Sequence, residues 1–250
     1  MCQRESGCRA LWLGVEDMTA TLVNKGQSVN KTTEAFRGLR DAGICPMPMM
    51  MHHDTQPLYS RGSNYGLLNQ IKVLRKAGAV SLQVLMITPS AGTKLYEQTF
   101  AGGQVFKAVG GRPVEPHMYD GNHVVASRHP RPWRKQLNLL AAYLYFYNPV
   151  SMLAAMLGRK DRVGWKPVGM QVIGMLGLAR TIRRTLGWAV RLGVGRVERL
   201  AAPPACPIPV RGAGDAAASH AAACGADVVS SGPARRGRSV ALPVSMPVGR

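Results

Sequence analysis

Residues 64–86, NYGLLNQIKVLRKAGAVSLQVLM, join a helical pattern directly to a strand pattern. The apolar residues of the first part recur on one face at helical spacing, and Gly78 stands where a glycine commonly ends a helix. Residues 79–86 are almost all apolar, as in a strand that is buried on both faces. The stretch therefore predicts a helix over residues 64–77 and a strand directly after it.

An earlier segment of the chain repeats this alternation. Residues 10–15, ALWLGV, are typical of a short buried strand. Residues 30–42 place their apolar side chains on one helical face, with Asn30 as the expected N-cap and Gly43 at the expected C-terminal glycine position. This segment predicts a second strand–helix unit.

The apolar run 44–51, ICPMPMMM, is the expected strand between the two helices. Pro46 and Pro48 cannot donate to a ladder of hydrogen bonds, so they predict an edge strand or an irregular strand. Strands alternating with helices through short links indicate a parallel sheet in an α/β fold. Because parallel strands are normally buried on both faces, three of them form an incomplete sheet, and a barrel or a doubly wound sheet would need more strands than this chain supplies.

The remainder of the chain has a different character. Residues 101–135 are punctuated by glycine and proline and predict an irregular extension, followed by mostly helical structure. Residues 201–250 are dominated by Ala, Pro, Gly, Arg, Ser and Val without a periodic apolar face, which predicts a disordered tail. The expected division is the incomplete parallel sheet with its helices over 1–100, an irregular and then helical carboxyl-terminal extension over 101–200 and a tail over 201–250.

Two segments of the extension indicate contact with a membrane. Residues 137–157 contain no charged side chain, but Asn148 and Pro149 interrupt them, which favours a helical hairpin, buried or at the membrane interface, over a transmembrane helix. Residues 168–195 form a basic amphipathic helix that suits an anionic membrane surface or, alternatively, is an ordinary solvated helix. We therefore expect peripheral membrane contact through residues 137–195.

Charge and cysteine content restrict the class of protein. The formal net charge of +19 predicts attraction to anionic partners, although the basic tail contributes part of it. No basic run is interleaved with aromatic residues, so nucleic acid is not an expected partner. The five cysteines fit no disulfide framework or paired zinc motif, and the start of the chain has no apolar signal segment, which predicts a cytoplasmic protein, in part peripheral on the inner membrane face.

Four short segments together resemble the second half of a radical S-adenosylmethionine barrel of the cobalamin-dependent type. The resemblance implies that residues 1–100 are half of a parallel (β/α) barrel. The most specific segment is ITPSAGTKLY, which is similar to the family's Thr-Pro-x-x-Gly-Thr-x-Leu-Tyr sequence after its sixth strand. The others resemble the fourth strand with its Gly-x-Glu, the helix end before the fifth strand, and a Tyr-Asp-x-x-His-Val segment. The four segments are LWLGVEDM at 11–18, DAGI at 41–44, ITPSAGTKLY at 87–96 and YDGNHVV at 119–125.

Further stretches resemble the hopanoid C-3 methylase group within that superfamily. They are MMMHHD at 49–54, RGSNYGLLNQ at 61–70 and the region from RPWR at 131–134 to YNP at 147–149. The resemblance implies a methyltransferase that acts on an isoprenoid lipid and uses S-adenosylmethionine, a 4Fe–4S cluster and cobalamin. Such chemistry belongs to the cofactors, whereas the protein supplies binding and positioning.

The cluster motif of the family is missing from this sequence. The family uses three cysteines spaced Cys-x3-Cys-x2-Cys, whereas Cys2 and Cys8 are separated by five residues and precede what resembles the fourth strand. Iron–sulfur clusters need thiolate ligands, and the cobalamin domain is also not found here. We therefore expect a carboxyl-terminal fragment that is inactive as an isolated chain, and we leave open whether it is an enzyme by itself.

Four residues are the expected cofactor contacts. Glu16 follows a strand at the edge where parallel α/β folds bind ligands, and the resemblance implies contact with S-adenosylmethionine; otherwise it is a surface carboxylate that caps a helix. Gln83 lies within an apolar strand and either points into the cavity or bonds to neighbouring backbone. Thr88 and Pro89 close the third strand at the same edge.

Four further residues are expected to line the substrate cavity. His52 and His53 follow the second strand, where adjacent side chains point to opposite faces, so at most one faces the cavity. Tyr119 and His123 lie in the irregular extension, at a cavity mouth or in a loop hydrogen-bond cluster. We expect no metal ligands among them, and neither a phosphate-binding glycine loop nor a hydrolase triad is evident.

These patterns leave two rival functions open. One is a different radical S-adenosylmethionine reaction, such as ring formation or methylthiolation. The other is a non-enzymatic protein that binds a membrane surface through its basic helix.

Overall fold

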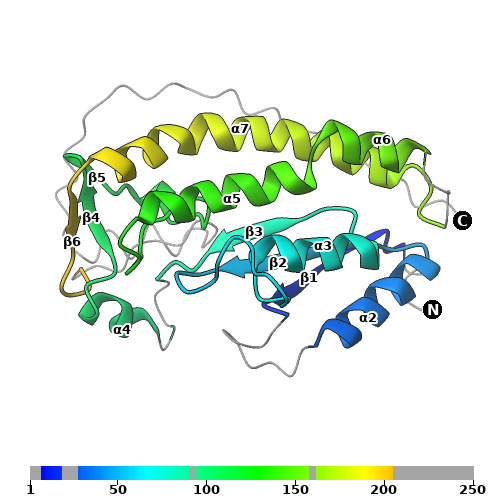
Figure 1. The fold of residues 1–250 in the computed structure, drawn as a ribbon, viewed down its shortest axis with the longest axis horizontal. Helices are drawn as coiled ribbons and strands as arrows, with labels where there is room; N and C mark the ends of the chain where they lie inside the picture. The colour runs from blue at the N-terminus through cyan, green and yellow to red at the C-terminus, as the bar shows by residue number, and fades with distance from the viewer. Residues whose placement is uncertain (1–6, 19–27, 90–92, 94, 158–161, 205–250) are drawn as a thin grey trace, which may run out of the picture. The chain divides into compact units, whose positions relative to one another are not determined.

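The computed structural model describes residues 7–18, 28–89, 93, 95–157 and 162–204, all within one compact unit that spans Met1–Ala213 (Figure 1). The disorder predicted for the tail falls on residues beyond 204 and lies outside the described residues. The division into 1–100 and 101–200 stays a prediction.

Three strands form a parallel sheet in the order β1-β2-β3. Their bounds, and those of the intervening helices, are β1 Ala10–Glu16, α2 Val29–Asp41, β2 Cys45–His52, α3 Leu67–Ala77 and β3 Gln83–Met86. The α/β class and the parallel sheet of three strands are therefore confirmed. That the sheet is half of a radical S-adenosylmethionine barrel stays a prediction.

The helix ends follow the expected glycines but not the expected N-cap. Gly43 follows α2 with a φ of 74°, and Gly78 caps α3 with a φ of 102°, a left-handed conformation that glycine adopts without strain. Ser28, not Asn30, is the N-cap of α2, and its hydroxyl accepts the N–H of Lys31 at 3.3 Å. Serine two residues earlier takes this position, so the helix begins at Val29.

The two prolines of β2 lie in the central strand, so the expectation of an edge strand was wrong. Alternate residues of a parallel strand bond to opposite neighbours; Cys45 bonds toward β1, and Pro46 accepts the N–H of Val80 on the other side at 3.1 Å. The missing N–H groups of Pro46 and Pro48 therefore face the β3 side. Because the β3 ladder begins only at Gln83, no strand hydrogen bond is lost there.

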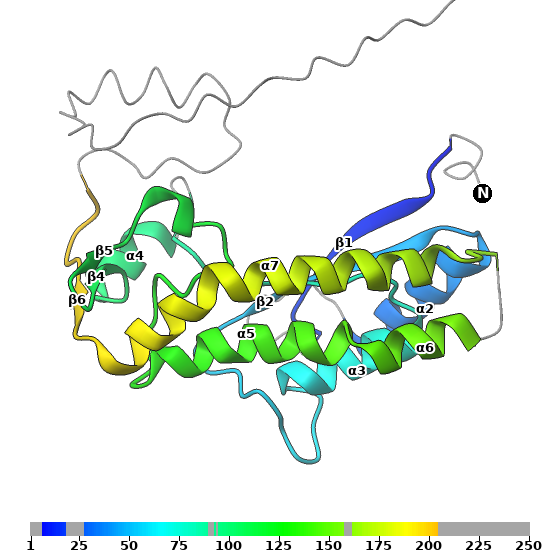
Figure 2. The same cartoon turned by 90° about the horizontal axis from the view of Figure 1, so that it is seen from above.

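Three helices form the carboxyl-terminal half of the described structure. They are α5 Pro132–Phe146, α6 Pro149–Leu157 and α7 Lys166–Val194. Helices α5 and α6 follow one another, and α7 returns alongside both (Figure 2). Residues 137–157 are thus two successive helices rather than the expected hairpin, because Asn148 caps α6 by accepting the N–H of Ser151 at 2.9 Å and Pro149 begins it.

A small antiparallel sheet accompanies these helices. Strands β4 Phe106–Val109 and β5 Arg112–Pro113 pair with each other, and β6 Val197–Arg199 pairs with β4 from beyond α7. The segment 101–135, which was expected to be irregular, therefore contains strands β4 and β5 and a 3₁₀ turn at Pro116–Met118. The short helix α4 Leu95–Ala101 ends where this segment begins. The strands were not predictable because each has only two to four residues.

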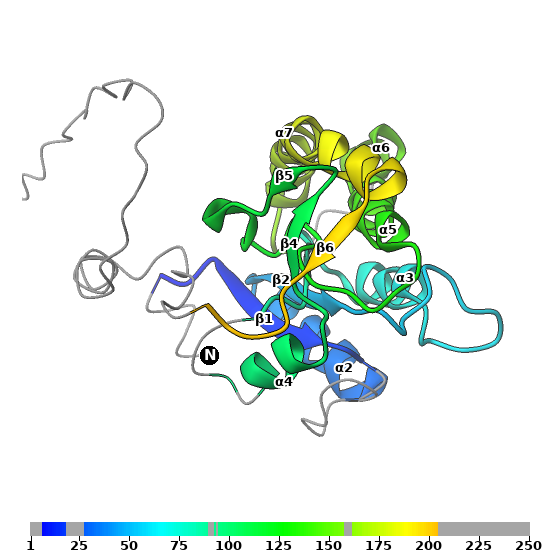
Figure 3. The same cartoon turned by 90° about the vertical axis from the view of Figure 1, so that its left-hand side faces the viewer.

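The two faces of the parallel sheet differ in burial. Helices α2 and α3 lie on one side of it (Figure 3), where Met50, Val84 and Met86 are buried with Phe36 and Leu67. On the opposite face Cys45 and Met47 are buried, whereas Met49 and Met51 are partly exposed and Trp12 of β1 is 48% exposed. Because parallel sheets are normally covered on both sides, this half-covered face is the unusual feature of the fold.

The outer edge of β3 is occupied by tyrosines instead of a fourth strand. The hydroxyl of Tyr143 accepts the N–H of Val84 at 3.1 Å and donates to the carbonyl of the same residue at 2.8 Å. Tyr147 does the same for Leu82, at 2.6 and 2.9 Å. Four residues of helix rise by about 6 Å and two residues of strand by about 6.6 Å, so the two tyrosines match alternate residues of β3.

Candidate functional site

The carboxyl end of β1 has a strained backbone at Glu16. This residue has a φ of 53°, the one positive φ among the described non-glycine residues. Its carboxylate folds back along the sheet, so that a Cβ built on Gly14 would lie 2.9 Å from Oε1 of Glu16. A glycine two residues before the glutamate therefore leaves space for the carboxylate on the half-covered face.

Neighbouring hydrogen bonds hold this turn in place. The amide nitrogen of Gln70, on α3, donates to Oδ1 of Asp17 at 2.6 Å, and its Oε1 accepts the N–H of Met18 at 3.2 Å. Asp17 and Gln70 are 1% and 0% exposed. Strained residues persist where the surroundings fix them, and they are frequent at functional sites.

Gln83 lies on the same face as Gly14. Gly14 pairs with Met49, and Met49 pairs with Gln83, so the three residues form one row across the sheet. Met49 and Gln83 are partly exposed, as is Met51 one row further along. The row places an amide and the Glu16 carboxylate over an apolar, half-covered surface.

Thr88 and Pro89 follow β3 at the carboxyl edge that Glu16 also occupies. Thr88 is partly exposed and Pro89 is buried. Part of the adjoining ITPSAGTKLY segment, residues 90–92 and 94, lies outside the described residues. The structure therefore places all four expected cofactor contacts on one face or edge of the sheet, with Thr88 and Pro89 beyond its end.

His52 lies on the helix-covered side, with no exposed surface. Its Nδ1 is 2.7 Å from Oε1 of Gln56, and its Nε2 is 3.2 Å from the amide nitrogen of Asn138. A neutral imidazole that donates from Nδ1 and accepts at Nε2 satisfies both partners. Burial and, to a smaller extent, the positive charge of Lys135 lower the pKa of His52 to about 4. The hydrogen bond to Gln56 opposes this shift.

His53 belongs to a neighbouring polar cluster. Its Nδ1 is 2.9 Å from the hydroxyl of Thr55, and its Nε2 is 3.4 Å from that of Tyr65. Burial lowers its pKa to about 4, although the charge of Asp17 opposes the shift. The buried ammonium of Lys135 donates to the carbonyl of His53 at 3.3 Å, and burial lowers its pKa as well.

His123 and Tyr119 lie apart from this edge, in the loop that faces α7. Nδ1 of His123 is 3.0 Å from Oδ1 of Asp120. Burial favours a raised pKa for Asp120, but the hydrogen bonds from His123 and Asn122 outweigh it and leave the pKa lowered. Burial, together with Tyr96, raises the pKa of Tyr119 to about 12.

The expected site residues thus fall into three places rather than one cavity: the half-covered face, the buried polar cluster and the α7 loop. Their roles as cofactor or substrate contacts stay predictions. Sequence reasoning missed the polar partners that hold the edge together. The residues missed are Asp17, Gln56, Gln70, Lys135 and Asn138. A polar amide within an amphipathic helix was an available signal for Gln70 and Asn138 alone.

Comparison with known proteins assigns no role to these residues. Within the described ranges, no three His, Cys, Asp or Glu side chains are grouped so that they could hold a metal ion. No family model matches the chain, and no curated protein or solved structure is significantly similar to it.

Proposed function

We propose that this chain is the carboxyl-terminal, cofactor-facing part of a radical S-adenosylmethionine methyltransferase that acts on a hopanoid-type lipid and uses cobalamin, and that the isolated chain is inactive. The observation that carries this proposal is the parallel sheet with one half-covered face. Ligands of parallel α/β folds bind at the carboxyl ends of the strands, where Glu16 and Thr88 lie.

The chemistry of this face fits S-adenosylmethionine. Its sulfonium and amino groups are cationic, and the Glu16 carboxylate over Gly14 supplies the opposite charge. Gln83 supplies an amide for hydrogen bonding, while Met49 and Met51 supply soft apolar contacts. When bound, this cofactor supplies the organic radical, and the chain's own residues bind and orient it.

The described residues do not fit an iron–sulfur cluster. Cys8 is partly exposed two residues before β1, and Cys45 is buried at the first position of β2. Two separated thiols cannot replace three ligands. The cluster and cobalamin therefore belong, in this proposal, to a partner segment, and we derive no step through either group.

The helical half supports a lipid substrate. Large apolar side chains of α6 and the first half of α7 remain exposed: Val150 76%, Leu153 52%, Leu157 78%, Ile173 61% and Leu176 68%. By length and composition alone, one helical run among the described residues, 132–157, would suffice to cross a membrane. Exposed apolar surface of this extent marks interaction sites, and we assign it to the uptake of substrate from a membrane.

The DNA sequence immediately before the codon of Met1 tests the proposal. We expect a reading frame that encodes Cys-x3-Cys-x2-Cys, in frame or separated by a frameshift. A cobalamin-binding domain further upstream would support methyl transfer, whereas its absence would favour ring formation or methylthiolation. A preceding frame without the cysteine motif would contradict the assignment to this superfamily.

Binding of S-adenosylmethionine to the purified chain tests the site itself. Equilibrium dialysis with labelled S-adenosylmethionine should show that Glu16→Gln weakens binding about tenfold, because a charge-assisted contact is lost. Glu34→Gln, at an exposed position of α2, is the matched control and should leave binding unchanged. Equal affinities for all three proteins would remove Glu16 from the site.

A further inference from the structure

Three adjoining hollows lie between α7 and the loop that contains His117 and His123, away from the half-covered face. Their volumes are about 220, 280 and 60 Å³. His123 and Arg184 line all three. We call this region the α7 groove.

The α7 groove has an excess of positive charge. Arg180, Arg183, Arg184 and Arg191 of α7 line its hollows. None of these four guanidinium groups is paired with a carboxylate in the part of the chain that the structure describes. An anion that enters the groove therefore meets cations whose bonding capacity is free.

The two carboxylates nearby are already engaged. Glu115 accepts Arg112 at 3.0 Å and lies 3.1 Å from His117. Asp120 accepts the N–H of Asn122 at 2.8 Å and lies 3.0 Å from the ring of His123. Each carboxylate thus reduces the local positive charge, but neither reaches the arginines of α7.

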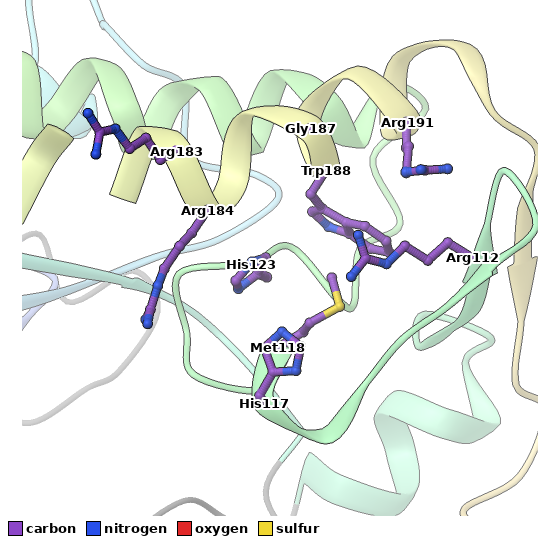
Figure 4. A pocket seen from close by; sticks show the side chains of 9 residues that line it. All are labelled: Arg112, His117, Met118, His123, Arg183, Arg184, Gly187, Trp188 and Arg191. Atoms are coloured by element: carbon purple, nitrogen blue, oxygen red, sulfur yellow. The ribbon is translucent and has the colours of Figure 1, made fainter. Parts of the chain in front are cut away.

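The groove is open in its centre. A Cβ built on Gly187 would meet no atom within 4 Å, so this helical glycine faces empty space. Figure 4 shows Arg184 and Arg112 extending on either side of His117 and His123, whereas Arg183 points away. Donors from two elements therefore surround the hollow from opposite sides.

The wall opposite the arginines is rigid. The buried indole of Trp188 donates to the carbonyl of Val124 at 3.0 Å. The side chain of Gln136 accepts the N–H of Val124 at 2.9 Å and donates to the carbonyl of Asn122 at 2.8 Å. Because the loop backbone is fixed on both sides, binding does not have to order it.

We infer that the α7 groove binds a phosphate-bearing anion. Guanidinium groups match the oxygens of phosphate geometrically and are weakly hydrated, so unpaired arginines in a concave site favour it. The two larger hollows, of about 220 and 280 Å³, have room for a phosphate or diphosphate group beside Arg184, which lines both. The ligand is therefore a phosphate or diphosphate group, presented by a soluble molecule or by a lipid headgroup.

Calorimetric titration of the full chain with inorganic pyrophosphate tests this inference. We expect saturable binding to one site, weakened about tenfold or more by Arg184→Gln. Arg196→Gln is the matched control because Arg196 is exposed, lies two residues beyond α7 and lines none of these hollows. The affinity of this variant should stay within about twofold of that of the unmodified chain, because an exposed charge outside the hollows is screened by solvent and salt.

A second pair of variants separates shape from charge. Gly187→Leu fills the groove without changing any charge, and should weaken binding as strongly as Arg184→Gln. Gly177→Leu is its control on the same helix, since a Cβ there also meets nothing within 4 Å. Circular dichroism confirms that all four variants fold.

The outcomes decide both the inference and the source of the phosphate. Absence of saturable binding, or equal weakening by Arg184→Gln and Arg196→Gln, overturns the inference and leaves a solvated basic helix face. If phosphatidic acid vesicles compete with pyrophosphate, the ligand is a headgroup; if they do not, it is a soluble phosphate. Because the groove is separate from Glu16, these results are independent of S-adenosylmethionine binding.

Discussion

The hydroxyl of Tyr147 satisfies both backbone groups of Leu82, accepting the N–H at 2.6 Å and donating to the carbonyl at 2.9 Å. It also lies 2.8 Å from the hydroxyl of Ser81, which completes its capacity of one donor and two acceptors. One side chain thus replaces a strand partner at this edge.

We expect Tyr147→Phe to destabilise the chain by about 2 kcal/mol, because the backbone groups of Leu82 remain buried without a partner. Tyr59→Phe, at a side chain that is 64% exposed, is the control and should change the free energy of unfolding by less than about 0.5 kcal/mol. Urea denaturation measures both. Equal stability of the two variants would show that water or another group takes over the bonding of Leu82.

The backbone at Glu16 leads to a second prediction. Since its φ of 53° is unfavourable for a residue with a Cβ, Glu16→Gly should be more stable than Glu16→Ala by about 1 kcal/mol. Both variants should lose binding of S-adenosylmethionine, because both lack the carboxylate. Denaturation curves for the pair test the strain; a more stable alanine variant would mean that this turn is not strained.

Acid should weaken the fold through His52. Its folded pKa of about 4 lies below the unfolded value of about 6.5, so the unfolded chain binds a proton first as the pH falls. The neutral imidazole therefore makes its full contribution to the free energy of unfolding above about pH 6.5. As the pH falls from about 6.5 to 4, this free energy decreases by up to about 3 kcal/mol. Urea denaturation at several pH values should give a shallower pH dependence for His52→Gln, and identical slopes would contradict this origin.

The exposed apolar side chains of α6 predict binding to vesicles. Flotation with anionic vesicles should show binding that the double variant Leu153→Asp with Leu157→Asp reduces about tenfold or more, since each leucine contributes about 1.5–3 kcal/mol when buried. Tyr59→Asp supplies the control for an exposed position outside these helices. Flotation at low and high salt separates the two contributions to vesicle binding, because salt weakens the attraction of the arginines but not the burial of the apolar residues.

Complete failure of the chain to bind vesicles at low and high salt would exclude the non-enzymatic membrane-binding protein, the rival function favoured by α6 and α7. It would also weaken the case for a lipid substrate. If the chain binds vesicles but does not bind S-adenosylmethionine, the result would instead favour the non-enzymatic membrane-binding protein.

The order of the strands and helices was predictable because local patterns determine it. Buried runs and helical periodicity marked the parallel sheet, and Gly43 and Gly78 marked the helix ends. The prolines of β2 were misinterpreted because the length of β3 decides which N–H groups matter, and that length depends on tertiary contacts. Likewise, β6 pairs with a strand about ninety residues earlier, which no local pattern shows.

The candidate site was predictable only in part. Gln83 could be placed from strand alternation, because register in a parallel sheet follows from the apolar pattern. The position of Glu16 could not, because the register of β1 shifts between Gly14 and Glu16 and the φ of Glu16 is 53°. The α7 groove could not, since it requires the loop around His123 to meet a helix some sixty residues later. Separations of this size depend on packing rather than on sequence spacing.

Tyr143 and Tyr147 close the outer edge of the parallel sheet beside β3. At Leu82 and Val84 the outer edge of β3 has no backbone N–H or C=O group left for a further strand, since the hydroxyls of Tyr147 and Tyr143 bond to them. A segment that extended the sheet on this side would first have to displace both tyrosines.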